Sequence, residues 1–256
     1  MKRYNAYLID LDGTMYWGDE PIESAADFVE SLALKDVPYL FLTNNSSKTQ
    51  ARVSDKLQQM GICATPEHIF TSSMATAKYI KQLKNGARCY VIGEEGLHDA
   101  LKREGHIVTD ENCDFVVFGI DRDINYEKLS KACREVRNGA SFISTNGDVA
   151  LPTERGLEPG NGALTSVVTT STGVNPTFIG KPESIIMEQA LEQIGSAKNE
   201  TLMVGDNYHT DILAGMNAGL DTLMVFTGVT PHSDLPTLEK KPTYHVRNLN
   251  EWIDYI

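Results

Sequence analysis

Short continuous apolar runs alternate along the chain with longer segments in which apolar residues recur at helical spacing. The runs at residues 7–9, 39–42 and 201–204 have the length and the unbroken hydrophobicity of strands that are buried on both faces. Segments such as residues 24–35 instead repeat apolar residues at intervals of three and four, which is typical of amphipathic helices. Because helices of crossover length follow the strands, the pattern predicts an α/β protein with parallel sheets.

The same pattern assigns nearly the whole chain to elements. The predicted strands are residues 7–9, 39–42, 89–92, 115–119, 141–145, 178–179, 201–204, 222–226 and 244–246. The predicted helices are residues 24–35, a segment ending at residue 60, residues 72–84, 95–103, 126–138 and 163–172, a helix through residues 187–194, and a terminal helix. We expect a hairpin around Gly18, with Tyr16 and Trp17 packing it, and a long Gly- and Pro-rich loop at residues 147–162. Ser24 is expected to cap its helix.

Acidic residues outnumber basic residues, with 35 Asp and Glu against 23 Lys and Arg and a formal net charge of −12. This charge excludes a general affinity for nucleic acid or for anionic membranes, so an anionic ligand would need a local positive charge. The four cysteines have neither the Cys-x-x-Cys pattern nor zinc-ligand spacing, which indicates reduced thiols. With no apolar run of membrane-spanning length and no signal-peptide pattern before the first strand, we expect a cytoplasmic protein.

Polar residues follow four of the predicted strands, at the sheet edge where open α/β sheets place their chemistry. They are Asp10, Asp12 and Gly13 after the first strand, Thr43, Asn44 and Asn45 after the second, Lys181 after residues 178–179, and Asp206 and Asp211 after residues 201–204. The spacing of two predicts that Asp10 and Asp12 lie side by side, and Gly13 lets the backbone bend toward a ligand. Each set alone also fits a turn, a helix cap, a surface lysine or a helix-dipole carboxylate.

Taken together, the four sets favour chemistry over turn formation. Several carboxylates at one place repel each other unless a cation joins them, and an oxygen-only ligand set without His or Cys favours Mg²⁺. Carboxylates around such a cation, with a lysine and a hydroxyl beside them, make a receptor for a phosphate group.

In order and spacing, these motifs resemble those of the haloacid dehalogenase superfamily of aspartyl-phosphate phosphatases. Residues 205–215, 145–148 and 159–164 resemble the corresponding motifs of its NagD-like subfamily, whose members dephosphorylate small phosphate monoesters. The resemblance extends from Asp10 to about Gly228. It implies a phosphoric monoester hydrolase that acts on a small phosphorylated metabolite.

The resemblance also implies a role for each motif residue. Asp10 would attack phosphorus, and Asp12 would protonate the leaving oxygen and later deprotonate the hydrolytic water. Lys181 would balance charge at the nucleophile and the phosphate. The implied phosphate- and substrate-binding residues are Gly13, Thr43, Asn44, Asn45, Lys181 and Asn146. The implied Mg²⁺ ligands are Asp10, the main-chain carbonyl of Asp12, Asp206 and Asp211, the last of them directly or through water.

The long insertion between Asn45 and Lys181 matches the superfamily's second type of cap. The implied fold is a Rossmann-like, doubly wound parallel sheet core at residues 1–80 and 177–256, with an inserted α/β cap at residues 81–176. The cap would exclude water and select the substrate, with the loop at residues 146–151 facing the leaving group.

Three apolar residues, Val149, Ala150 and Leu151, stand where relatives that act on pyridoxal phosphate have bulkier and more polar side chains. We therefore expect sugar phosphates as substrates, with nucleoside monophosphates and pyridoxal phosphate as alternatives. Two other functions stay open, namely a dehalogenase or phosphotransferase and a phosphometabolite-binding module without turnover. Asp12 argues against the dehalogenase, which has no leaving alkoxide to protonate. The sequence leaves a homodimer open and names no residue for it.

Overall fold

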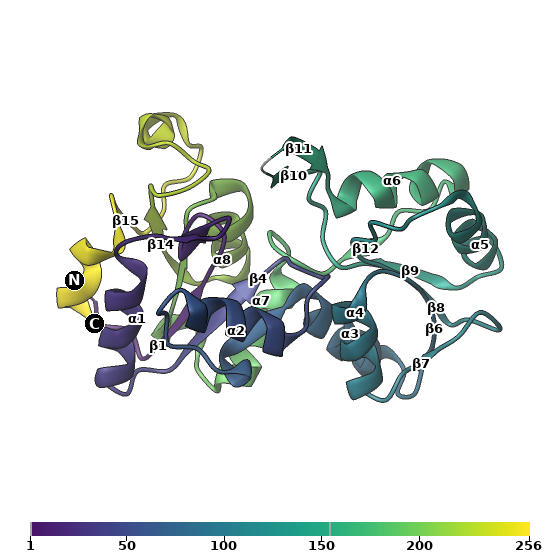
Figure 1. Cartoon of the computed structure of the whole chain (residues 1–256), viewed down its shortest axis with the longest axis horizontal. Helices are drawn as coiled ribbons and strands as arrows, with labels where there is room; N and C mark the ends of the chain where they lie inside the picture. The colour runs from purple at the N-terminus through teal and green to yellow at the C-terminus, as the bar shows by residue number, and fades with distance from the viewer. Residues whose placement is uncertain (1, 154) are drawn as a thin grey trace. The chain divides into compact units, whose positions relative to one another are not determined.

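The computed structural model describes residues 2–153 and 155–256, and it divides into two compact units. The first unit consists of residues 2–43, 50–70 and 181–256, and the second of residues 44–49 and 71–180. Each unit has its own sheet and its own helices, which can be followed along the chain in Figure 1. The α/β class predicted from the sequence is therefore confirmed.

The first unit is built on a six-stranded sheet with the order β15-β14-β13-β1-β4-β5. Its strands are β1 (Ala6–Ile9), β4 (Tyr39–Thr43), β5 (Ile69–Thr71), β13 (Thr201–Gly205), β14 (Asp221–Val225) and β15 (Tyr244–Val246). The pairs β1–β13, β1–β4, β13–β14 and β14–β15 are all parallel. Because the chain extends the sheet first on one side of β1 and later on the other, the sheet is doubly wound. The sequence pattern had not predicted β5.

Among the described residues, four α-helices belong to this unit, namely α1 (Ala25–Leu34), α2 (Gln50–Gln59), α7 (Ser184–Ile194) and α8 (Leu213–Ala218). Alternate residues of a strand point to opposite faces, so Tyr7 and Ile9 of β1 share a core with Phe28 of α1 and Leu57 of α2. Helix α7 contacts β4, and α8 contacts β14. The terminal segment Leu249–Tyr255 is a 3₁₀ helix. Ser24 stands at the N-cap of α1, but its side chain makes no capping hydrogen bond; its hydroxyl accepts one from the amide of Leu249 at 3.3 Å.

The second unit contains a parallel sheet of five strands in the order β12-β9-β8-β6-β7. Its strands are β6 (Arg88–Ile92), β7 (Ile107–Val108), β8 (Phe115–Phe118), β9 (Ser141–Ser144) and β12 (Thr177–Phe178). Its helices are α3 (Ser72–Leu83), α4 (Glu95–Arg103), α5 (Tyr126–Arg137) and α6 (Asn161–Thr172). No helix in the described part of the chain is long and apolar enough to cross a lipid bilayer.

Part of the stretch expected to be a long loop is an antiparallel hairpin, β10 (Ala150–Thr153) paired with β11 (Gly156–Pro159). Gly156, the first residue of β11, has φ +109°, a backbone conformation that favours glycine. Helix α6 begins two residues earlier than expected. Gly160 and Gly162 permit this, because a Cβ atom on either would collide with the backbone of residues 147–148.

Helix α3 belongs to the second unit, whose long segment begins at residue 71 and ends at residue 180. The sequence placed the boundaries of the insertion at residues 81 and 176. Helix α3 contacts α4, and its Ser72 hydroxyl donates a hydrogen bond to the carbonyl of Asn44 at 2.8 Å. The short segment of residues 44–49 joins the second unit with it.

Candidate active site

Two acidic residues of the first unit follow directly after neighbouring parallel strands. Asp10 follows β1 and Asp206 follows β13, whose register pairs Ile9 with Val204. The amide of Asp10 donates a hydrogen bond to the carbonyl of Val204 at 2.9 Å, which holds the two strand ends together. The sheet therefore places both carboxylates at one edge, as the apolar runs before them predict.

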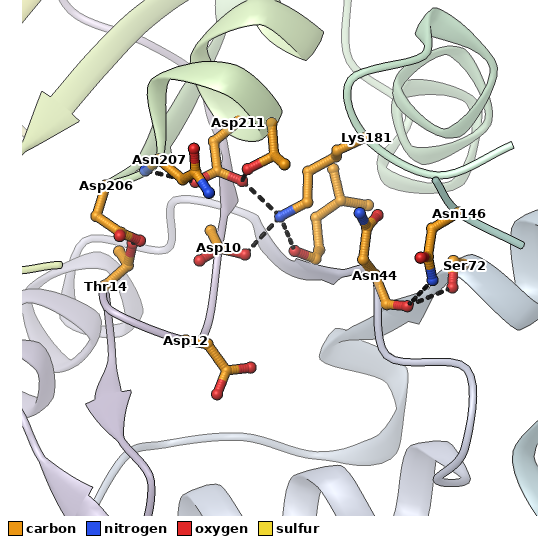
Figure 2. Close-up of polar contacts among 12 residues, drawn as sticks. Asp10, Asp12, Thr14, Asn44, Ser72, Asn146, Lys181, Asp206, Asn207 and Asp211 are labelled. Atoms are coloured by element: carbon orange, nitrogen blue, oxygen red, sulfur yellow. Dashed lines mark hydrogen bonds and ion pairs between the residues drawn. The ribbon is translucent and has the colours of Figure 1, made fainter. Parts of the chain in front are cut away.

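A third carboxylate comes from the segment after β13. Asp211 lies in a π-helical turn, Tyr208–Ile212, and its Oδ2 accepts a hydrogen bond from the amide of Asn207 at 3.0 Å. Ligand atoms of Asp10, Asp206 and Asp211 all lie within 4.8 Å of one another (Figure 2). All three side chains are buried. The donor set is entirely carboxylate oxygen, which suits a hard cation such as Mg²⁺.

Lys181 supplies the positive charge that these acids need. Its Nζ atom contacts Oδ1 of Asp10, lies 2.7 Å from Oδ1 of Asp211 and donates to the carbonyl of Leu42 at 3.0 Å (Figure 2). The residue is 2% exposed and precedes a cis peptide bond to Pro182. The structure thus brings together Asp10, Lys181, Asp206 and Asp211, which the sequence could propose only from separate strand ends.

The ionisation of these groups is strongly perturbed. Burial raises the pKa of Asp10 well above its ordinary value and Asp211 raises it further, while Lys181 opposes both effects. Burial and Asp211 also raise the pKa of Asp206 from 3.8 to about 6. Burial lowers the pKa of Lys181, but Asp10 and Asp211 outweigh it and raise that pKa above its ordinary value. The lysine therefore stays charged, whereas the negative charges of Asp10 and Asp206 are only partly compensated.

Glycines and one hydroxyl surround Asp206. A Cβ atom on Gly13, whose φ is +87°, would lie 2.5 Å from Oδ2 of Asp206, and one on Gly228 would collide with the same oxygen. The carboxylate accepts hydrogen bonds from the Thr14 hydroxyl at 3.0 Å and from the Val229 amide at 2.6 Å. Sequence reasoning missed Thr14, Gly228 and Val229. Only Thr14 carried a signal, as the polar residue after Gly13.

Asp12 lies apart from the three buried acids. Its side chain is exposed and points away from Asp10 (Figure 2). The expectation that the two carboxylates lie side by side is wrong, because β1 ends at Ile9 and the chain turns immediately afterwards. The Leu11 carbonyl accepts hydrogen bonds from the amides of Thr14, Met15 and Tyr16 in this turn.

Thr43 ends β4, is buried, and belongs to the same unit as the acids. Asn44, Asn45 and Asn146 belong to the second unit. Asn45 uses its Oδ1 to accept hydrogen bonds from the amides of Ser47 and Lys48, both at 3.0 Å, so this oxygen shapes its own turn.

Asn44 and Asn146 lie together in the second unit. Asn146 Nδ2 donates to the Asn44 carbonyl at 2.8 Å, and Asn44 Nδ2 donates to both carboxylate oxygens of Asp148 at 3.1 Å. Buried Asn161 supports this loop by donating to the Asn146 carbonyl at 2.8 Å and to the Ser144 hydroxyl at 2.9 Å. Sequence reasoning singled out neither Asp148 nor Asn161, although both lie in the segments that carried the resemblance.

Comparison with known proteins agrees with this geometry. A family model described as haloacid dehalogenase-like hydrolase matches residues 7–107, and one described as HAD-hydrolase-like matches residues 178–252. The chain is 60% identical over 256 residues to 5'-nucleotidase YutF of Bacillus subtilis strain 168, covering all of both chains. It is 53% identical over 254 residues to the acid sugar phosphatase of Staphylococcus aureus strain USA300, covering 99% of this chain and 98% of the relative.

A solved structure, NagD from Escherichia coli K-12, matches all of this chain over all of its own length, with a TM-score of 0.93 and 34% identity. Both the sequence and the fold are therefore shared over the complete length that is compared. The chain belongs to the haloacid dehalogenase superfamily and, within it, to the NagD-like phosphatases, which are phosphoric monoester hydrolases.

Proposed function

We propose that this chain is a Mg²⁺-dependent phosphatase that hydrolyses small phosphate monoesters, foremost sugar phosphates, through an aspartyl-phosphate on Asp10. The observation that carries the proposal is the buried ammonium of Lys181, held between Asp10 and Asp211 beside Asp206. Thr43 is buried at the end of β4, the strand beside β1. A lysine among three carboxylates, with such a hydroxyl, can receive a phosphoryl group next to a carboxylate nucleophile.

In the first half-reaction, a carboxylate oxygen of Asp10 forms a bond to phosphorus while the bond from phosphorus to the leaving oxygen breaks. Asp12 gives its proton to that oxygen, which departs as an alcohol. In the second half-reaction, Asp12 takes a proton from water as the water oxygen attacks phosphorus. Inorganic phosphate leaves, and the Asp10 carboxylate is restored. Lys181 keeps the nucleophile oriented and its negative charge balanced through both steps.

The three buried acids fit Mg²⁺ by their chemistry, because they offer only carboxylate oxygens and lie within 4.8 Å of one another. Asp10, Asp206 and Asp211 would hold the ion, and the carbonyl of Asp12 is a further proposed ligand. When bound, the ion would supply positive charge to the phosphoryl oxygens. The raised pKa values of Asp10 and Asp206 are what three crowded carboxylates show before a cation joins them.

Sugar phosphates are proposed first for two reasons. The hairpin β10–β11 begins with Ala150 and Leu151, whose side chains offer no polar group to the aromatic ring of pyridoxal phosphate. The Staphylococcus relative is named an acid sugar phosphatase. The B. subtilis relative is named a 5'-nucleotidase, which favours nucleoside monophosphates as a second candidate. We propose Asn44, Asn45, Asn146, Thr43 and Gly13 as substrate- and phosphate-binding residues.

Phosphate release from a panel of substrates tests the proposal. Sugar phosphates, nucleoside 5'-monophosphates, pyridoxal phosphate and p-nitrophenyl phosphate are each incubated with Mg²⁺ or with chelator, and Asp10→Asn serves as the blank. We expect chelator-sensitive release that is absent from the blank and is fastest for a sugar phosphate. A nucleotide ranked first would support the second candidate. No release from any substrate would favour a binding module and would contradict the proposal.

A further inference from the structure

The backbone fixes Tyr16 opposite Asp12. These two residues form an isolated β-bridge, and the amide of Gly13 donates a hydrogen bond to the carbonyl of Tyr16 at 2.8 Å. Tyr16 then begins the hairpin of β2 (Tyr16–Trp17) and β3 (Glu20–Pro21). Main-chain bonds thus set the position of the Tyr16 backbone relative to the Asp12 backbone.

Further contacts from the segment around Thr227 and from helix α2 hold the hairpin in place. Trp17 Nε1 donates to the carbonyl of Thr227 at 2.6 Å, and the Thr227 hydroxyl donates to the carbonyl of Gly13 at 2.7 Å. From α2, Lys56 donates to the carbonyl of Gly18 at 2.6 Å, and its Nζ lies 4.2 Å from the centroid of the Tyr16 ring. A cation over the ring face restrains the ring while it leaves the edge hydroxyl to other partners.

The Tyr16 hydroxyl meets the Asp12 carboxyl group. The Tyr16 hydroxyl donates a hydrogen bond to Oδ2 of Asp12, with 3.5 Å between the two oxygen atoms. The tyrosine is 6% exposed, whereas Asp12 is exposed. One oxygen of an exposed carboxyl group therefore accepts a hydrogen bond from a buried hydroxyl. The distance is at the long end for a hydrogen bond, so its effect should be moderate.

We propose that Tyr16 is a positioning residue for Asp12, whose hydroxyl keeps Oδ2 as an acceptor and so directs the transferred proton to Oδ1. This inference rests on the proposed function, in which Asp12 is the general acid and base. While Asp12 is protonated, the proton sits on Oδ1 and moves to the leaving oxygen as the phosphorus–oxygen bond breaks. In the second half-reaction, Oδ1 takes a proton from water, while Oδ2 accepts from Tyr16 throughout.

The basicity of the leaving group separates this role from a purely structural one. An alkoxide leaving from a sugar phosphate needs a proton as it departs, whereas p-nitrophenolate is a weak base and needs little help. The ratio kcat/KM reports the steps up to transfer of the phosphoryl group to Asp10. A positioning residue for the general acid must therefore affect kcat/KM for the sugar phosphate more than for the aryl phosphate.

The experiment compares Tyr16→Phe with wild type on glucose 6-phosphate and p-nitrophenyl phosphate. Phenylalanine keeps the ring under Lys56 and removes only the hydroxyl. We expect kcat/KM to fall about fivefold for glucose 6-phosphate, the worth of a modest hydrogen bond, and less than about twofold for p-nitrophenyl phosphate. Tyr39→Phe is the matched control, since that hydroxyl donates to the Cys63 carbonyl at 2.9 Å, and it should change neither value.

A double-mutant cycle supplies a second measurement. In the Asp12→Asn background, Tyr16→Phe should produce no further loss, because a residue that acts through Asp12 has nothing left to position. Equal losses on both substrates, no loss on either, or multiplicative losses in the cycle would each overturn the inference while wild type still hydrolyses both esters. Wild-type protein that released no phosphate from either ester would instead refute the proposed function, and the inference with it.

Discussion

Lys181 and Asp211 form a fully buried ion pair, with Nζ 2.7 Å from Oδ1 and side chains that are 2% and 1% exposed. The same ammonium contacts Asp10, so one cation is paired with two buried carboxylates. Breaking such a pair from one side leaves charge buried without compensation, which costs far more than losing a surface pair.

Replacing Lys181 with methionine should therefore destabilise the protein by about 3–5 kcal/mol as well as abolish phosphate release. The measurement is chemical denaturation in the presence of chelator, alongside the phosphatase assay. Lys81→Met is the control, because Lys81 pairs with Glu104 at the surface and its loss should cost about 1 kcal/mol or less. Similar losses for the two variants would contradict the buried-charge argument.

Asp10→Asn should separate activity from stability. The variant lacks the nucleophile, so turnover should fall to background. Burial and Asp211 raise the pKa of Asp10, which shows that its negative charge is unfavourable in the folded, metal-free protein. We therefore expect the melting temperature in chelator to be unchanged or higher than that of wild type.

Asp19→Asn, which alters an exposed carboxylate of the same segment, should change neither activity nor melting temperature. Appreciable residual turnover in Asp10→Asn would show that another residue attacks phosphorus.

Asp206 should make stability depend on pH in a defined window. Its pKa is about 6 in the folded protein and 3.8 ordinarily, so the carboxyl group favours the folded state fully below pH 3.8. This contribution is lost as pH rises through 6 and amounts to about 3 kcal/mol. In chelator, the free energy of unfolding of wild type should therefore fall between pH 4 and 6 relative to Asp206→Asn, and remain parallel above that range.

Added Mg²⁺ should reverse this trend above pH 6, because the ion binds the deprotonated carboxylates and stabilises only the folded state. The shift in melting temperature with Mg²⁺ should grow from pH 5 to pH 7.5 in wild type and be absent from Asp206→Asn. A shift independent of pH, or one retained in the variant, would remove Asp206 from the proposed ion site.

The strands that carry Asp10 and Asp206 were predictable because a buried parallel strand is a continuous apolar run, which is a local property of the sequence. The direction of the Asp12 side chain was not predictable. The Leu11 carbonyl accepts hydrogen bonds from three backbone amides, and the chain therefore turns within four residues. The hairpin strand Ala150–Thr153 was not predicted, for another reason. Its residues are mostly exposed and show no apolar alternation, so nothing marked them as a strand.

Contacts between residues that are far apart in the sequence could not be predicted either. Asn44 and Asp148 are 104 positions apart, and no spacing rule predicts that the amide of one donates to both oxygens of the other. Lys181 could be singled out only because it stands at a strand-to-helix junction. Its contacts with Asp10 and Asp211 depend on the assembled sheet.

Gly13→Ala should disturb Asp206 through both backbone and space. The residue has φ +87°, and an added Cβ would lie 2.5 Å from Oδ2 of the carboxylate. We expect a loss of stability of about 2 kcal/mol or more together with loss of the Mg²⁺-induced shift in melting temperature. Gly18→Ala is the matched control, since its φ is +54° but a Cβ there meets nothing within 4 Å. If both variants lose the shift alike, the close approach to Asp206 is not what matters.

Asn161 should prove essential to the loop that carries Asn146 and Asp148. Its Nδ2 donates to the Ser144 hydroxyl and to the Asn146 carbonyl, and the residue is 2% exposed. Asn161→Asp keeps the shape but turns this donor into an acceptor that faces other acceptors. We expect the free energy of unfolding to fall by about 1–3 kcal/mol. We also expect a raised KM for phosphate esters, because the loop that we propose to bind substrate loses the hydrogen bonds that hold its shape. Asn138→Asp, at the exposed end of α5, should leave both quantities unchanged. An Asn161→Asp protein with wild-type stability and KM would show that the loop holds its shape without these hydrogen bonds.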